Sequence, residues 1–358
     1  MKRLWIALCL LLLLPSAHAA EARDEISVVD VSALQEAVGE AGAEIDVRAL
    51  MISLACGEGE ETVEGLIAAA RRVILSEFGA MRVQLLWLIA PSLLWAVNRY
   101  LLGGSDLSET AGLVCFVCAA GVLLNLVNEG MALTRQTMQR TCVLTARFFP
   151  ILSGLKGIAG AADMLSPVVT LMGGALSVFL EKAVRILAGG AAAAAIAGNL
   201  STRVPLQSLF RLFCTAGNWL LGGVMAVFGA MISLCGIVGS ANGSIAMKTV
   251  KYAVGTLLPI VGGEVAGSME VMTASASAVC GAAGITGVLV MLCVCLRPVV
   301  RLTGSMLCCM ISSALTEPVA DGSLRRCTEQ IGQVVRLLTA ASCVNAVLFI
   351  VLTGTICA

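Results

Sequence analysis

The residues best able to do chemistry in this chain are a few charged side chains in apolar surroundings. Glu264 lies in the stretch LLPIVGGEVAGS (257–268), among apolar and small residues. A charge at the centre of a membrane helix costs at least ~2.5 kcal/mol, so such groups tend to face other helices or water. This stretch therefore predicts a carboxylate that is buried at a helix junction or exposed to an inner aqueous surface.

The same stretch carries the residues that would form such a junction. Pro259 interrupts a helix, and Gly262 with Gly263 permits a break in the backbone. Gly263 and Gly267 form a GxxxG pattern, which lets a second helix approach closely. The pattern alone is weak evidence, because the chain contains 37 glycines.

Other charges in apolar stretches are spaced so that two of them share one helix face. These pairs are Lys156 with Asp163, Glu181 with Arg185, and Arg297 with Arg301. Two interpretations stay open: they orient helices as internal pairs or snorkelling ends, or they line an aqueous path. Glu317 completes the set of candidate helix-junction or pore-facing residues.

Residues and motifs that the sequence lacks exclude several enzymatic mechanisms. The only histidine is His18, near the N-terminus, so a chain cleaved after it has no histidine for a catalytic triad or zinc site. No GxxxxGK[ST] phosphate loop occurs. A Ser-Lys hydrolase stays formally open, but no spacing singles out a pair from the serines and lysines. We expect no enzyme, no cofactor and no metal.

The 15 cysteines do not indicate a disulfide framework. Most lie in or beside apolar stretches, where a thiol packs as a small hydrophobic group. Cys115 and Cys118 match CxxC, but they lie within an expected membrane span and have no second pair. We therefore expect neither redox nor metal function from them.

The composition is that of a membrane protein, with 58% hydrophobic and 13% charged residues. The chain opens MKRLWIALCLLLLLPSAHAAEA, in which a basic start, an apolar run and Ala17-His18-Ala19 form a signal-peptide pattern. We expect residues 1–20 to be a signal peptide cleaved after Ala19 or Ala20. An uncleaved signal anchor is the alternative, although the apolar run is short for a ~30 Å hydrocarbon core.

An acidic segment follows the leader. Residues 21–80 carry 13 Asp+Glu against 4 Lys+Arg, a composition that suits export. Apolar residues from Val63 to Phe78 recur at helical spacing, with Arg71, Arg72 and Glu77 elsewhere on the helical wheel. This amphipathic helix is expected to rest on the membrane, to contact a partner or to pack on its own neighbours.

The remainder, 81–358, is expected to be a multi-span membrane domain, which makes the fold class an all-α polytopic bundle. The clearest apolar stretches are 83–102, 111–133, 215–238, 278–296 and 331–356, while 148–199 and 250–267 are broken by Gly, Pro and charges. We expect about seven spans plus one or two broken or re-entrant segments. Arg203 to Phe213 predicts a short interfacial helix.

The orientation of these spans is not settled by charge. With residues 21–82 outside, loop 103–110 would lie inside without a basic residue, and a loop carrying Arg135, Arg140 and Arg147 would lie outside. This arrangement opposes the positive-inside rule. Either the first apolar pair does not span in this way, or packing overrides the rule.

Several motifs resemble one family. The run KTVKYAVGTLLPIVGGEVAGSMEVM (248–272), then LRPVVRL (296–302), then ALTEPVADGSLRRCTEQIGQVVRLL (314–338) resembles stage III sporulation protein AE of endospore-forming bacteria. The resemblance is strongest from about 245 to 358 and looser from 80 to 245. No role is carried onto Glu264, a position at which we expect the family to vary.

The resemblance implies a role in a multiprotein assembly. Such proteins sit in the mother-cell membrane around the engulfed forespore, in the channel complex called a feeding tube. The implied partners are other stage III subunits, including a separate ATPase, and a forespore-made partner across the intermembrane space. A homo-oligomer is compatible with this role, and no nucleic-acid partner is expected.

Two further classes stay open beside a non-enzymatic assembly subunit. An autonomous secondary transporter of a small solute or ion would use broken membrane segments with acids near the midplane. A lipid-embedded enzyme is disfavoured by the absent histidine. Solute movement by the purified protein alone would separate the transporter from the assembly subunit.

Overall fold

The described part of the chain consists of long α-helices without a strand. In the computed structural model these are α4 (Gly59–Leu102), α5 (Asp106–Ile158), α6 (Ser166–Leu200), α7 (Gln207–Leu257), α8 (Gly262–Thr316) and α9 (Gly322–Cys357). The structure describes these helices, the turn residues Leu206 and Glu317, and the isolated residues Gln35 and Ala49. Side chains are described for 71–98 except Ala80, for 110–150, 170–200, 206–233, 284–317 and 322–353, and for Tyr100 and Val168.

The all-α polytopic fold class is confirmed. Six helices in the described residues are long and apolar enough to cross a membrane, by length and composition, where the sequence predicted about seven spans. Helix α5 has 53 residues and α8 has 55. At 1.5 Å per residue each is about 80 Å long, so both project well beyond a ~30 Å hydrocarbon core.

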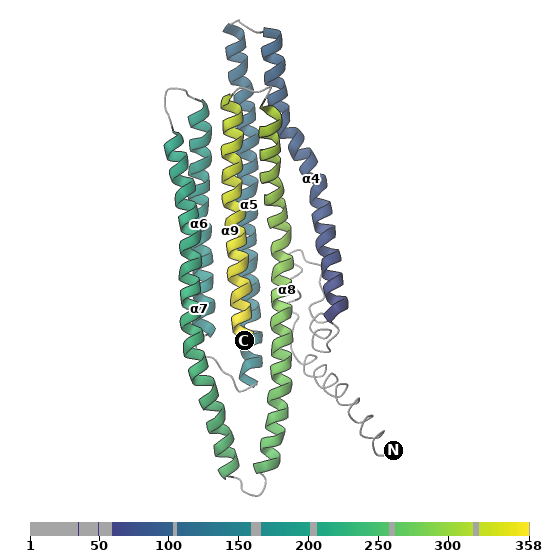
Figure 1. The fold of residues 1–358 in the computed structure, drawn as a ribbon, viewed down its shortest axis with the longest axis vertical. Helices are drawn as coiled ribbons and strands as arrows, with labels where there is room; N and C mark the ends of the chain where they lie inside the picture. The colour runs from purple at the N-terminus through teal and green to yellow at the C-terminus, as the bar shows by residue number, and fades with distance from the viewer. Residues whose placement is uncertain are drawn as a thin grey trace.

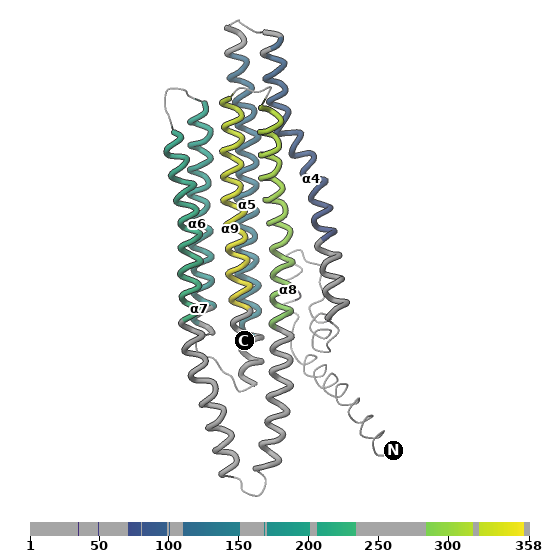
Figure 2. Tube along the Cα trace, viewed as in Figure 1, coloured from purple at the N-terminus to yellow at the C-terminus, as the bar shows by residue number. Residues whose placement is uncertain are grey.

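The helices form an elongated bundle with α9 and α5 at its centre (Figure 1). Helices α6 and α7 lie together on one side, α8 flanks α9 on the other, and α4 lies outermost and is bent. Pro91 lies inside α4, and an internal proline removes a backbone hydrogen bond and kinks a helix. Figure 2 traces the same path and shows in colour the residues whose side chains are described.

The core is built around α9, which contacts α5, α6, α7 and α8. Its residues Ile331, Leu348 and Leu352 have no exposed surface. Small residues allow close approach at the helix contacts. A Cβ added to Gly190 of α6 would lie 2.9 Å from the Phe213 ring of α7, so the ring fills the space that a side chain would need.

The predicted loop around Arg135, Arg140 and Arg147 is wrong, because all three lie within α5. No Pro or Gly occurs between Gly130 and Pro150 to end the helix. Four buried threonines on one face donate to backbone carbonyls three or four residues earlier, which satisfies their hydroxyls inside the bundle: Thr134, Thr137, Thr141 and Thr145.

The short interfacial helix predicted for Arg203 to Phe213 is also not a separate element. Residues from Gln207 onward are the first turns of α7, which continues to Leu257. Phe210 is 3% exposed, and the Phe213 ring packs on Gly190 of α6. The apolar residues of this segment therefore pack against helices of the bundle.

Residues 63–78 form a helix, as their amphipathic pattern predicted, but the face that is buried differs from the predicted one. Ile74 and Phe78 are 37% and 53% exposed, whereas Glu77 is buried. The reason is an ion pair of Glu77 with a partner on α8, described below. Helix α4 runs through residues 80 and 81, where we placed the boundary between exported segment and membrane domain. That boundary stays a prediction, and the leader lies outside the described residues.

Candidate functional site

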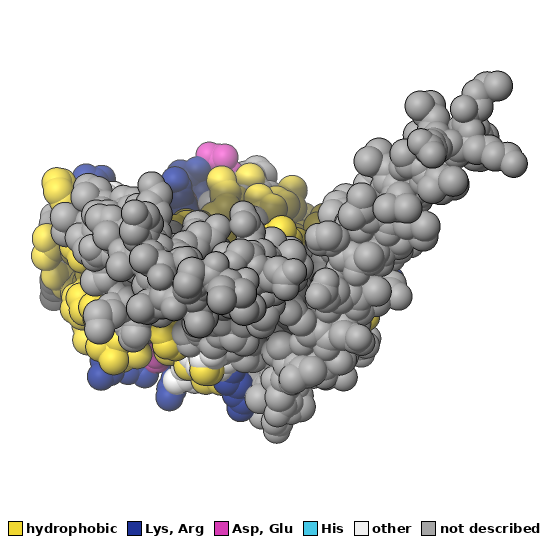
Figure 3. All heavy atoms as spheres, turned by 90° about the horizontal axis from the view of Figure 1, so that it is seen from below, with side chains coloured by type: hydrophobic (Ala, Val, Ile, Leu, Met, Phe, Trp, Pro, Cys, Tyr) yellow, Lys and Arg dark blue, Asp and Glu magenta, His cyan; other side chains and the backbone are white. Residues whose placement is uncertain are grey.

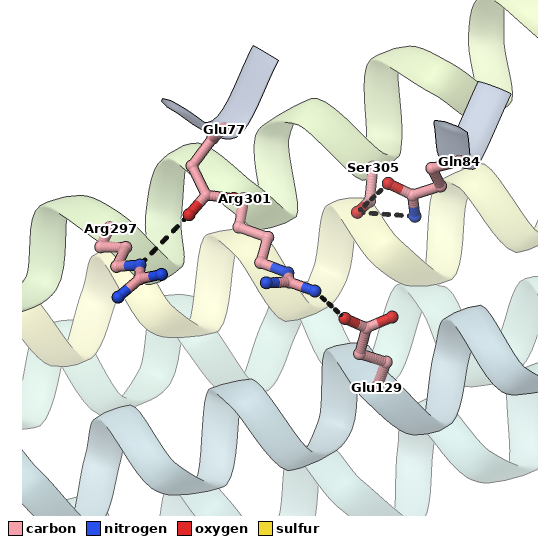
Figure 4. A network of polar contacts seen from close by, with 6 residues as sticks. All are labelled: Glu77, Gln84, Glu129, Arg297, Arg301 and Ser305. Atoms are coloured by element: carbon pink, nitrogen blue, oxygen red, sulfur yellow. Dashed lines mark hydrogen bonds and ion pairs between the residues drawn. The ribbon is translucent and has the colours of Figure 1, made fainter. Parts of the chain in front are cut away.

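One face of α8 carries a row of polar side chains that reaches two neighbouring helices. Arg297, Arg301 and Ser305 are four residues apart, so they lie one above another on that face. The Arg297 Nε donates to Glu77 Oε1 of α4 at 3.1 Å, and Arg301 pairs with Glu129 of α5. Figure 4 shows both ion pairs, together with Ser305 and Gln84.

The Gln84 contact extends the row along α4. Gln84 donates from Nε2 to Ser305 Oγ at 3.0 Å, and the Ser305 hydroxyl lies 3.2 Å from Gln84 Oε1. Ser305 is 7% exposed. Three polar contacts in a row therefore join α8 to α4 and α5.

The two ion pairs differ in burial. The Glu77 side chain is 6% exposed while its partner Arg297 is 66% exposed. Arg301 and Glu129 are 43% and 47% exposed, so each retains groups that can bind something else. A buried carboxylate needs a partner, because its transfer out of water costs several kcal/mol. Arg297 therefore serves chiefly to compensate Glu77.

A cleft of about 660 Å³ adjoins these pairs between α4, α5 and α8, and we name it the α4/α5 cleft. Its volume is typical of ligand sites. It combines charged and amide groups with apolar side chains. The lining residues are Glu77, Met81, Val83, Gln84, Trp87, Leu88, Cys118, Gly121, Val122, Asn125, Leu126, Glu129 and Arg301.

A second polar network lies in the core, around Asn345 of α9. Its Nδ2 donates to Thr141 Oγ1 of α5 at 2.8 Å, and its Oδ1 accepts from Ser177 Oγ of α6 at 2.7 Å. Asn345 has no exposed surface, and Thr141 and Ser177 are also buried. The network is satisfied by protein groups, so it joins three helices and offers no open site.

Residues 45–358 match the sequence model of the family described as stage III sporulation protein AE. The chain belongs to this family. The AE-family chain is also 19% identical over 258 residues to "Stage III sporulation protein AE" of Bacillus subtilis (strain 168), a match that covers 71% of this chain and 65% of that protein. No solved structure matches it.

The structure brings together some residues that the sequence singled out in the AE-family chain. Arg297 and Arg301 share one face of α8, as their spacing predicted. Glu317, just after α8, pairs with Arg325 of α9 at 2.6 Å and so links the ends of two consecutive helices. Glu181 pairs at 3.5 Å with Arg135 of α5, whereas the sequence pattern had suggested Arg185.

Other candidates in this AE-family chain are not placed by the structure. Helix α7 ends at Leu257 and α8 begins at Gly262, on either side of Pro259. Pro259 and Asp163 lie outside the described residues, and only the helical backbone is described for five further candidates: Lys156, Gly262, Gly263, Glu264 and Gly267. Their role at a helix junction or a pore stays a prediction.

Several residues of the site were missed from the sequence. Glu129 lies within the apolar stretch 111–133 and was not singled out, and Glu77 was placed on the helical wheel away from the apolar residues of 63–78. One signal in the sequence could have indicated these partners. Two arginines on one face of α8 can be neutralised by two acids, and α4 and α5 each supply one acid. Sequence distances of 220 and 172 residues hid these partners.

The ten cysteines of the AE-family chain whose side chains the structure describes are free thiols. Five of them are buried: Cys115, Cys295, Cys308, Cys309 and Cys327. Within the described residues no group of His, Cys, Asp and Glu could hold a metal ion. The CxxC pair lies along α5, with Cys118 exposed at the α4/α5 cleft.

Proposed function

We propose that this protein is a non-enzymatic multi-pass subunit of the sporulation channel complex that links mother cell and forespore. Family membership supports a sporulation role, and the six apolar helices support a place in the membrane. The mother-cell membrane around the forespore is its proposed location. Other stage III subunits, a separate ATPase and a forespore-made protein are its proposed partners.

The observation that carries a role within an assembly is the exposed face of α9, the central helix. Its exposed side chains are polar over four positions and then apolar over two: Arg326, Glu329, Gln333 and Arg336, followed by Val347 and Val351. The four polar residues are three or four apart, as are the two valines relative to each other, and the step of 11 residues from Arg336 to Val347 makes about three helical turns, so all six lie on one stripe. We name the polar part the α9 polar stripe.

Lipid is a poor neighbour for the deepest residue of this stripe. Arg336 lies 14 residues after the start of α9 at Gly322 and 21 residues before its end at Cys357. It is therefore about 20 Å and 30 Å from the two helix ends. An arginine so far along a membrane helix faces protein or water by preference. A neighbouring subunit or an aqueous conduit would satisfy it.

The outer surface carries further charges of this kind. Seen end-on, Lys and Arg side chains appear on two opposite sides of the bundle among hydrophobic ones (Figure 3). At hydrocarbon depth a transporter working alone would be expected to confine such groups to its interior, whereas a neighbouring chain can cover them in an assembly. Arg336 in the α9 polar stripe is the charge that favours an assembly subunit over an autonomous secondary transporter on this ground.

The test is deletion of the gene in its spore-forming host, scored after engulfment by forespore volume and a late forespore reporter. We expect shrinking forespores and a silent reporter, restored by the wild-type chain. Normal spores from the deletion strain would overturn the proposal. Solute uptake by the purified protein alone, in vesicles without other subunits, would favour the transporter instead.

A further inference from the structure

The α4/α5 cleft is amphipathic along its length. Helices α4 and α5 run antiparallel, so Glu77 lies near Glu129 at one end and Leu88 near Cys118 at the other. Each helix contributes 11 residues between those ends, which corresponds to about 16 Å. Half of a ~30 Å hydrocarbon core has nearly the same thickness. The cleft therefore matches one leaflet of a bilayer in length.

The polarity changes in steps along this length. The charged end holds Glu77, Glu129 and Arg301. Asn125 follows one helical turn from Glu129, is exposed and has no protein hydrogen bond in the described residues. Beyond it the one polar side chain in the described lining is Gln84, which is hydrogen-bonded to Ser305, and the other walls are apolar, with Trp87 and Val122 among them. This order of charge, amide and hydrocarbon follows the headgroup, ester and acyl regions of a phospholipid.

The charged end presents both signs at once. Glu77, Glu129, Arg297 and Arg301 sum to zero, since each acid is paired with one arginine. Arg301 and Glu129 are each about half exposed. One ion pair leaves donors free on a guanidinium that has five, and acceptor sites free on a carboxylate that has about four.

We propose that the α4/α5 cleft binds one phospholipid whose zwitterionic headgroup carries a primary ammonium, as in phosphatidylethanolamine. Its phosphate accepts hydrogen bonds from Arg301, its ammonium donates to Glu129, and Asn125 donates to an ester carbonyl. One acyl chain lies against Trp87, Leu88 and Val122. An anionic headgroup would leave Glu129 without a cation to replace Arg301, and a choline headgroup has no N–H to donate.

Gly121 is a position at which a substituted side chain could fill the cleft and block it. It lines the cleft, and a Cβ added to it would meet nothing within 4 Å. A large residue there fills the acyl region without a clash at its first atom. Replacing glycine within a helix also favours helix formation, by about 1 kcal/mol for alanine.

The experiment measures lipid retention by the full-length protein. The purified chain is mixed in detergent with equimolar phosphatidylethanolamine, phosphatidylglycerol and phosphatidylcholine of identical acyl chains, and native mass spectrometry counts the lipids kept. We expect one phosphatidylethanolamine per chain, retained about tenfold over the other two, the preference given by one charge-assisted hydrogen bond. Glu129→Gln with Arg301→Gln removes that preference.

A matched pair of variants separates the cleft from the rest of the surface. Gly121→Phe abolishes selective retention, whereas Gly222→Phe on α7, where an added Cβ also meets nothing within 4 Å, leaves it unchanged. Gly121→Leu replaces the first variant if circular dichroism shows that the phenylalanine prevents folding. Equal retention of all three lipids, preference for phosphatidylglycerol, or full retention by the blocked variant would each overturn the proposal. None of these outcomes depends on the channel function.

Discussion

At the scale of single residues, Glu77 and Arg297 differ in burial, so replacing one or the other should lower the free energy of unfolding by different amounts. Arg297→Ala leaves a carboxylate that is 6% exposed without its cation, so we expect a loss of about 3 kcal/mol in the free energy of unfolding. Glu77→Ala leaves an arginine that is 66% exposed and that water or lipid phosphates can satisfy. The expected loss there is about 1 kcal/mol. Unfolding of the variants in mixed micelles measures both values.

The second ion pair supplies the control for this asymmetry. Arg301 and Glu129 are exposed to nearly the same extent, 43% and 47%. Arg301→Ala and Glu129→Ala should therefore cost nearly equal amounts, each about 1 kcal/mol or less. Equal losses for Arg297→Ala and Glu77→Ala would show that the contribution of Arg297 to stability does not come from the burial of Glu77.

At the scale of helices, Asn345 joins α9 to α5 and α6 through two buried hydrogen bonds. Asn345→Leu keeps a similar volume and removes both bonds, so we expect a loss of about 1–2 kcal/mol in the free energy of unfolding. A double-mutant cycle with Ser177→Ala should give a coupling of about 0.6 kcal/mol or more. Asn218→Leu on the exposed face of α7 is the control, expected within about 0.5 kcal/mol of wild type. Losses that simply add in the double variant would contradict an energetic coupling between Asn345 and Ser177.

Helix contacts also explain which elements the sequence could predict. An apolar run of about 20 residues reports on the helix itself, so the stretches 83–102, 111–133, 215–238, 278–296 and 331–356 were located well. The fate of polar residues between them depends on partners elsewhere in the chain. Thr134 and Thr141 became interior because α9 supplied Ser342 and Asn345 beside them. The same limit hid Glu77 and Glu129, whose arginines lie on α8.

At the scale of the whole molecule, the exposed face of the central helix α9 has two halves. The α9 polar stripe is suited to contact with protein or water, and the apolar half that follows it is suited to contact with lipid. A benzophenone amino acid placed at Gln333 should therefore form a discrete adduct with another protein chain in sporulating cells. The same probe at Val351, on the apolar half of α9, should label lipid and give no discrete protein adduct. Photolysis followed by immunoblotting distinguishes the two. Lipid labelling alone at Gln333 would mean that the stripe has no protein neighbour, and Arg336 would then need an aqueous path to satisfy its charge.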